Sequence, residues 1–304
     1  MEKRRSAAPT TAMSIARAAA DIFGADAQEA GEIGYMARLL VQATLPHSKP
    51  KTREFERTNG ALTVRMVATK DGVGLPYGTY PRLLLSWVTT EAARTKSREL
   101  DLGHSLSSFM AQLGLQVTGG RKGTITVLRR QMDMLFRAAI SWSYRGDGHG
   151  LDEQIFPFKS RELWWDPKAS AAQHDLFRSR LVLTREFFDE LVKRPVPLDM
   201  RALRVLAQSR SPLALDIYTW LTYRLSYLRE PTDVSWAALQ MQFGAGYTRT
   251  DNFRKYFLEK LKAVKVLYPA AKVAPAEGGL TLWPSRTHVP AKVAGNLVDV
   301  TPPK

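Results

Sequence analysis

A duplicated pattern is the sequence feature that most constrains how this chain can fold. The segment Ser105–Gly114 is repeated in outline by Ser235–Gly244, and each segment precedes a turn and a basic, amphipathic stretch. A short helix that ends at Gly and leads into a helix with a cationic outer face is typical of a helix-turn-helix unit. The sequence therefore predicts two helix-turn-helix units in one chain.

Local signals predict the elements of the first unit. Apolar residues at helical spacing predict a helix around Leu83–Ala92, and Arg98–Leu102 predicts a short strand. Ser105 is the expected N-cap of the next helix. Gly119–Gly123 is the expected turn, and Thr124 is the expected N-cap of a third helix. This third helix would be the recognition helix of the unit.

The predicted recognition helix of the first unit has two distinct faces. Thr126 and Arg130 lie opposite its apolar side, with Arg129 on the flank. These three side chains are therefore expected to point away from the core. The apolar side is formed by four residues: Leu128, Met132, Leu135 and Phe136.

The second unit keeps the same order of elements. Leu213–Leu228 predicts a helix, Thr232–Ser235 a strand and Trp236–Gly244 the supporting helix. Asp251–Val264 is the predicted recognition helix, with its apolar residues again on one face. Its exposed face and the position before it carry polar and charged residues: Arg249, Asn252, Lys255, Glu259 and Lys262.

Each recognition helix is followed by a predicted β-hairpin. The first would consist of Ala139–Tyr144, a tip at Arg145–Gly150 and a return strand at Ser160–Trp165. The second would span Lys272–Trp283 and turn at Gly278 and Gly279. Helix, strand, two helices and a hairpin in this order are the elements of a winged helix. We therefore predict an α+β fold, mainly α, of two tandem winged-helix domains with an N-terminal accessory helix/strand region.

The domain boundaries follow from composition and from breaks in the pattern. Apolar residues between Ile33 and Val41 predict a helix that runs up to Pro46, and Leu62–Val67 predicts a strand. Pro195–Pro197 marks the expected boundary between the two units. The predicted division is an accessory region, two winged-helix domains and a flexible tail: residues 1–75, 76–194, 195–290 and 291–304.

The charge distribution points to a polyanionic partner. The chain has 304 residues and a formal net charge of +15. Arg121–Arg145 and Arg249–Lys272 each carry +5, so ten of the fifteen excess charges lie in the two recognition segments. A basic excess that served only solubility would be spread evenly. Clustered cations beside two helix-turn-helix units favour nucleic acid as the partner.

Several classes of protein are excluded or disfavoured by the sequence. It contains no cysteine, which rules out disulfides and thiolate metal sites such as zinc fingers. The five histidines have no metal-ligand spacing, and Gly114–Arg121 lacks the Gly-Lys-Ser/Thr ending of a phosphate loop. No apolar stretch is long enough to span a membrane. We therefore expect a cytoplasmic protein that is not an enzyme, with no metal, no cofactor and no membrane partner.

Polar and basic side chains near the two recognition helices are the predicted DNA contacts. Helix-turn-helix patterns also occur by chance in helical proteins, so the duplication and the matched charge are what favour DNA binding here. Any one surface Arg could instead be solvated or form a salt bridge. The ten candidates are Arg121, Lys122, Thr126, Arg129, Arg130, Arg145, Arg249, Asn252, Lys255 and Lys262.

A run of linked motifs resembles the plasmid-encoded RepA replication initiator family. The resemblance is strong from about Ile33 to Trp142 and weaker beyond. A linked series of this kind is more specific than any one helix-turn-helix. The motifs are Leu45–Ser48, Phe55–Gly60, Gly74–Leu85, Thr90–Thr95, Arg98–Leu100 and Leu113 with Gly119 and Gly120.

The resemblance implies a plasmid initiator that binds repeated sequences at the origin as double-stranded DNA. It further implies origin opening, recruitment of the host initiator DnaA and helicase DnaB, copy number control and a homodimer. A winged-helix transcriptional repressor is the alternative reading of the same fold. A nicking or primase enzyme would need a catalytic cluster, which the residues do not offer. Repeats of one site beside an origin would favour the initiator, and a lone palindrome over a promoter would favour the repressor.

Overall fold

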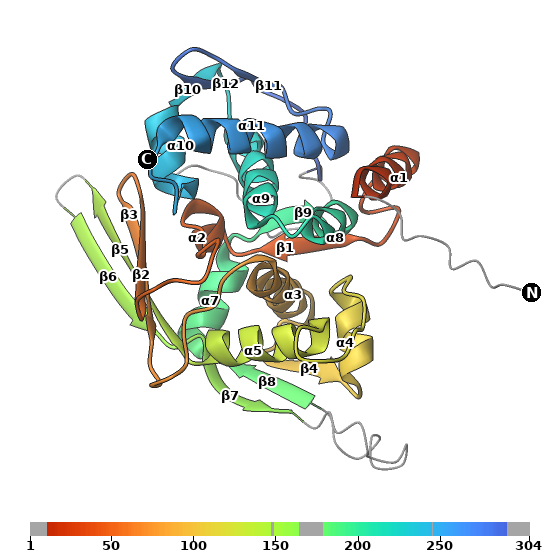
Figure 1. The fold of residues 1–304 in the computed structure, drawn as a ribbon, viewed down its shortest axis with the longest axis vertical. Helices are drawn as coiled ribbons and strands as arrows, with labels where there is room; N and C mark the ends of the chain where they lie inside the picture. Colours follow the sequence, from red (N-terminus) through yellow and green to blue (C-terminus); the bar gives the residue numbers. More distant parts are fainter. Residues whose placement is uncertain (1–10, 147–148, 164–178, 245, 291–304) are drawn as a thin grey trace, which may run out of the picture.

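The computed structural model describes residues 11–146, 149–163, 179–244 and 246–290. The chain forms α-helices around small antiparallel sheets, so the structure is a mixture of α and β. In Figure 1 the second helix-turn-helix unit lies at the top of the view and the first lies at the bottom. The N-terminal elements run between them and contact both.

The first unit contains the predicted helices and strand. They are α3 (Thr79–Thr95), β4 (Glu99–Gly103), α4 (Leu106–Gln112) and α5 (Thr124–Phe136). The strands that follow are β5 (Ala138–Gly146), β6 (His149–Ile155), β7 (Phe158–Glu162) and β8 (Ser179–Leu183), and α7 (Arg185–Lys193) comes after them.

The second unit repeats this order in a compact form. Its elements are α9 (Pro212–Tyr227), β10 (Thr232–Ser235), α10 (Trp236–Phe243), α11 (Thr250–Leu267), β11 (Val273–Pro275) and β12 (Gly279–Leu282). The three strands form one antiparallel sheet in the order β10-β12-β11. The hairpin after α11 therefore pairs with the short strand before α10. It turns through Gly278, as predicted, whereas Gly279, also predicted in the turn, is the first residue of β12.

The remaining elements connect the two units. They are α1 (Thr11–Gly24), β1 (Ile33–Met36), α2 (Arg38–Gln42), β2 (Glu54–Asn59), β3 (Leu62–Ala68), β9 (Val196–Asp199) and α8 (Met200–Gln208). The first helix packs against α8 and α11, whereas β3 pairs with β5 of the first unit. The expected boundary at Pro195–Pro197 falls at the start of β9, which pairs with β1.

The predicted helix between Ile33 and Pro46 is wrong. The segment instead forms β1, which pairs with β9, and the short helix α2. At Gly34 a Cβ atom would lie only 2.2 Å from Sδ of Met200, so a side chain there would collide with α8. Long-range strand pairing thus overrides the helical spacing of the apolar residues.

The return strand of the first hairpin is also not the predicted one. Within the hairpin, β5 pairs with β6, which follows immediately, while its other edge pairs with β3, and β7 pairs with β8 instead. The hairpin belongs to a four-stranded sheet in the order β2-β3-β5-β6. Ser160–Glu162 lies in β7, whereas Trp164 and Trp165 of the predicted strand lie outside the described residues, as does the predicted tail 291–304.

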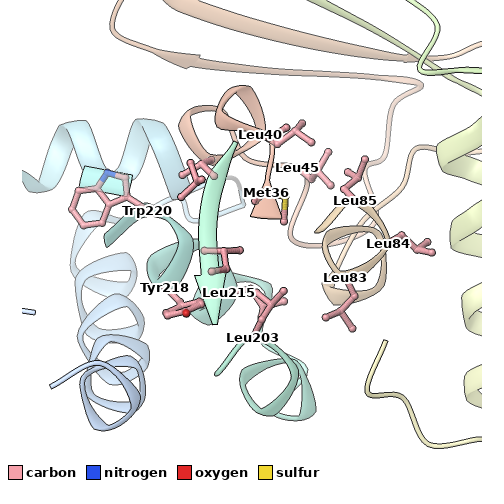
Figure 2. Packing of buried hydrophobic residues seen from close by; sticks show 14 of the residues in the cluster. Met36, Leu40, Leu45, Leu83, Leu84, Leu85, Leu203, Leu215, Tyr218 and Trp220 are labelled. Atoms are coloured by element: carbon pink, nitrogen blue, oxygen red, sulfur yellow. The ribbon is translucent and has the colours of Figure 1, made fainter. Parts of the chain in front are cut away.

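One hydrophobic core runs through both units. Figure 2 shows side chains of α2, α3, α8 and α9 gathered around β1 and β9. Leu83 and Leu85 come from the first unit, while Leu215 and Trp220 come from the second, and all four belong to the same buried cluster. Burial of this apolar surface stabilises the contact between the two units.

Candidate nucleic-acid interface

The turn that precedes α5 is closed by a set of local hydrogen bonds. The backbone N–H groups of Thr118 and Thr124 donate to each other's hydroxyl oxygens, both at 2.9 Å. The hydroxyl of Thr126 donates to the carbonyl of Gly120 at 2.9 Å. At Gly123 a Cβ atom would lie 2.2 Å from the carbonyl oxygen of Gly119, so the turn requires glycine there. The start of α5 is therefore held in one conformation.

The expected N-cap contact of Ser105 is present, and Ser235 makes the equivalent contact in the second unit. The hydroxyl of Ser105 accepts from the N–H of Ser108 at 3.1 Å, and that of Ser235 accepts from the N–H of Ala238 at 3.1 Å. The prediction that Thr124 is an N-cap is wrong by one position, because Gly123 occupies the cap. Thr124 is the first helical residue, and its hydroxyl donates to the carbonyl of Gln116.

The outward face of α5 carries the side chains that the sequence placed there. Leu128, Met132 and Leu135 are buried, whereas Thr126, Arg129 and Arg130 are exposed. The guanidinium of Arg130 donates to the hydroxyl of Tyr77 at 3.2 Å, which orients it beside the segment that precedes α3. Arg121 and Lys122, in the turn, are also exposed.

A group of ion pairs lies on the C-terminal half of the outward face of α5. Asp133 on α5 accepts from Nε of Arg137 at 3.0 Å and from Arg161 of β7. Burial alone would raise the pKa of the Asp133 carboxyl, but the hydrogen bonds from Arg161 and Arg137 outweigh this and lower the pKa. Strand β7 is thereby tied to α5, and the face presents cations around a single acid.

The buried face of α11 is aromatic. Phe253 and Phe257 are fully buried, with their ring centroids 5.5 Å apart. Phe257 also contacts Phe243 at 5.7 Å and Trp236 at 6.0 Å, and these two residues belong to α10. These ring contacts fix the angle at which α11 leaves the turn.

The opposite face of α11 is polar and exposed. Asn252, Lys255 and Lys262 are all exposed, as predicted from helical spacing. Arg249 occupies the N-cap position, and its guanidinium lies 3.5 Å from the carboxylate of Asp251. Glu259 lies among the lysines, and its pKa is lowered by a hydrogen bond from Lys260 and by the charges of Lys260, Lys255 and Lys262.

Sequence reasoning missed two exposed groups near α11. The guanidinium of Arg254 lies over the ring of Trp236, 5.4 Å from its centroid, which holds this cation against α10. Tyr256 is 46% exposed and its ring lies 5.7 Å from that of Tyr247. The signal that could have identified Arg254 and Tyr256 was the presence of aromatic residues between the basic positions. Aromatic rings and cations together are typical of a surface that binds a polyanion.

The ten predicted contacts form two groups. In Figure 1, α11 lies near the top of the view and α5 near the bottom, with β1, α3 and α8 between them. Arg145 lies on β5, in the hairpin of the first unit, and its side chain is exposed. Every one of the ten side chains is exposed, and the structure brings six of them to the first unit and four to the second.

The described residues contain no cluster of possible metal ligands and no membrane-spanning helix. Within these ranges no group of three or more His, Asp or Glu side chains is placed to hold a metal ion. No helix among them is both long enough and apolar enough to cross a bilayer.

Two solved structures share the fold. A crystal structure of RctB domains 2 and 3 covers 80% of this chain and 94% of that chain, with a TM-score of 0.50 and 11% identity. A structure of selenomethionine derivatives of the same two domains covers 81% and 98%, with a TM-score of 0.50 and 10% identity. No curated protein sequence matches the chain.

The fold defines a class of protein with two units of related element order around a common core. The sequence matches the family described as plasmid encoded RepA protein over residues 75–238, more than half of its length. The chain therefore belongs to the plasmid-encoded RepA family. This membership supports a role in replication initiation and agrees with the motifs that carry the resemblance.

Proposed function

We propose that the protein initiates plasmid replication by binding repeated sequences at the plasmid origin as double-stranded DNA. The observation that carries the proposal is the duplicated frame: a Ser-capped helix, a turn and a second helix with an exposed cationic face occur in both units. A helix presented in this way fits the major groove. Family membership supports replication, rather than repression of a promoter, as the purpose of that binding.

In this proposal each unit acts as a winged helix. The pairing of β10 with β12 of the hairpin in the second unit supports this proposal. The first unit has the same strand order, β4-β8-β7 beside β10-β12-β11, and differs in the hairpin β5-β6, which precedes β7 and joins the sheet that contains β2 and β3. Side chains of α5 and α11 would contact bases, while the hairpins and the remaining cations would contact phosphates.

The protein would act by binding alone, without covalent chemistry. Bound at several repeats in the cytoplasm, it would promote opening of the origin and recruit the host proteins DnaA and DnaB. A homodimer and copy number control belong to the same proposal. These steps extend the DNA-binding proposal, and each depends on it.

The test uses duplex DNA selected by the intact protein from a random-sequence library, followed by footprinting on the parent plasmid. Arg130→Ala and Lys255→Ala should each weaken binding about tenfold, while melting temperature and helical content stay unchanged. Arg185→Ala, on the exposed surface of α7 rather than on α5 or α11, is the matched control and should leave binding intact. Protection of a single promoter palindrome would favour the repressor instead, and a protein that selects no duplex would overturn the proposal.

A further inference from the structure

A buried ion pair joins corresponding helices of the two units. Arg82 belongs to α3 of the first unit, and Asp216 belongs to α9 of the second. Nε of Arg82 donates to Oδ1 of Asp216 at 2.7 Å, and Nη2 donates to Oδ2 at 2.7 Å. The two side chains are only 4% and 7% exposed. This paired geometry is specific for one relative orientation of the helices.

The N-terminal segment completes the site around this pair. The guanidinium of Arg82 also donates to the carbonyls of Leu45 and Pro46 and to that of Gly78, at 2.7 to 3.2 Å. Nε2 of His47 donates to Oδ2 of Asp216 at 2.7 Å. Two of the RepA-like motifs, Leu45–Ser48 and Gly74–Leu85, therefore meet at one carboxylate of the second unit.

Asp216 is the carboxylate that the buried cations of the cluster face. Arg57, on β2, is a second buried cation near this carboxylate, and burial lowers its pKa to about 10, so it remains charged at pH 7. Burial also lowers the pKa of His47 and keeps its ring neutral. Burial alone would raise the pKa of Asp216, but the charge of Arg82 and the hydrogen bonds from His47 and Arg82 lower it. One carboxylate thus faces two buried arginines.

Short chains of contact lead from this cluster to each recognition helix. Toward α5, the N–H of Tyr77 donates to the buried side chain of Gln131 at 2.9 Å, next to the Gly78 carbonyl that Arg82 holds. Toward α11, Trp220 of α9 contacts Phe243, which contacts Phe257. The positions of both recognition helices are therefore coupled to the same ion pair.

Neighbouring polar contacts tie the same N-terminal segment to α10. The hydroxyl of Thr44 donates to the carbonyl of Gln242 at 3.1 Å, and Arg57 donates to the carbonyl of Met241 at 3.0 Å. Both carbonyls belong to the helix that supports α11. Nε and Nη2 of Arg57 are buried and have no hydrogen-bond partner within the described part of the chain. The N-terminal segment from Thr44 to Arg57 therefore contacts each unit through buried polar groups.

We propose that Asp216 is a positioning residue that fixes the separation of α5 and α11, so that the protein reads two DNA segments at one spacing only. The inference rests on the proposed function, because it assumes that both helices contact DNA. It differs from that function in attributing the spacing to a buried carboxylate that touches no DNA. A protein whose units were joined only by a flexible connection would tolerate several spacings.

The first test uses the wild-type protein and the selected duplex, with base pairs inserted between the two protected segments. Inserting about 5 base pairs turns the second segment to the opposite face of the DNA, and inserting about 10 restores the face but moves the segment by one turn. Both insertions should weaken binding about 100-fold, since only one reader can then engage. Recovery of affinity with the full-turn insertion would overturn the inference.

The second test is Asp216→Asn, which keeps the size of the side chain but removes the charge that both arginines face. The penalty for the full-turn insertion should fall from about 100-fold to less than about tenfold, and affinity for the original spacing should drop. Asp199→Asn is the control, because Asp199 is also buried and also pairs with an arginine through both carboxylate oxygens, but its partner Arg201 is only two residues away, so this pair does not join α3 to α9. This control should keep the wild-type dependence on spacing.

The outcomes separate the two proposals. If the wild-type protein selects no duplex, the proposed function fails. If it binds duplex with little dependence on spacing, or if folded Asp216→Asn keeps the full dependence, only the positioning role fails. If Asp216→Asn is insoluble, Asp216→Glu takes its place in the comparison, because this substitution keeps the charge but shifts the carboxylate. The insertion series with the wild-type protein still tests whether binding depends on one spacing.

Discussion

Two substitutions on α11 that are two positions apart should change different properties of the protein. Phe257 is fully buried and contacts the rings of Trp236, Phe243 and Phe253. Replacing it with Ala leaves a cavity and should lower the free energy of unfolding by roughly 3 to 5 kcal/mol. Lys255 is exposed on the opposite face, so Lys255→Ala should change stability by less than about 0.5 kcal/mol.

Urea titration followed by tryptophan fluorescence measures the first effect, because Trp236 lies beside the deleted ring. DNA binding over a range of salt concentrations measures the second, since loss of one phosphate contact should make the slope of log K against log salt less steep by about 1. Folded Phe257→Ala protein should keep the wild-type slope. The assignment of the two faces would be refuted if Lys255→Ala shifted the urea midpoint as far as Phe257→Ala while leaving the slope unchanged.

The other predictions concern charge, protonation and the turns. The eight basic residues among the ten candidates should give a slope of about −7 for the wild-type protein if each neutralises one phosphate, and a nearly flat plot would contradict the electrostatic account. Burial lowers the pKa of His288 to about 4, whereas the pKa of His in the unfolded chain is near 6.5. The stability that the neutral ring contributes is therefore full above about pH 6.5. It is lost as the pH falls toward 4, by roughly 3 kcal/mol in total. Urea midpoints at pH 7 and pH 5 should show this decline, and His288→Gln should reduce it; equal declines in both proteins would disprove the assignment. Gly123→Ala should weaken duplex binding about tenfold with unchanged circular dichroism, because its Cβ would lie 2.2 Å from a backbone oxygen, whereas Gly119→Ala, which meets nothing within 4 Å, should be neutral. In the second unit, Gly279→Ala should likewise weaken duplex binding, because its Cβ would lie 2.0 Å from the Val234 carbonyl oxygen. Gly278→Ala is the matched control and should be neutral.

The elements that local signals specify were predicted well. Ser105 is the N-cap that was predicted, and the apolar spacing around Leu128 and Phe257 identified the buried faces of α5 and α11. These features depend on residues a few positions apart, so a single sequence contains the information. The ten candidate contacts are correspondingly exposed, while their contact with DNA stays a prediction.

Features that depend on distant residues were not predictable in this way. Ile33–Met36 carries the spacing of a helix, but its pairing with Val196–Asp199 makes it a strand. The return strand of the first hairpin was misplaced because β7 has a partner, β8, that follows a long connection. The Arg82 and Asp216 pair was missed as well. Its only signal was a lone charge in each of two otherwise apolar helical stretches, which indicates burial but not the identity of the partner.

The pairing of β1 with β9 has a consequence for the order of events during synthesis. Met36 pairs with Val196, 160 positions later in the chain. At a translation rate of about 5 to 20 residues per second, β1 leaves the ribosome roughly 8 to 32 s before its partner strand does. During that interval β1 has an unpaired edge, and the apolar side chains of α2 have not yet met α9. The N-terminal segment therefore reaches its final place late, and the nascent chain carries a strand open to other chains until residue 199 has emerged.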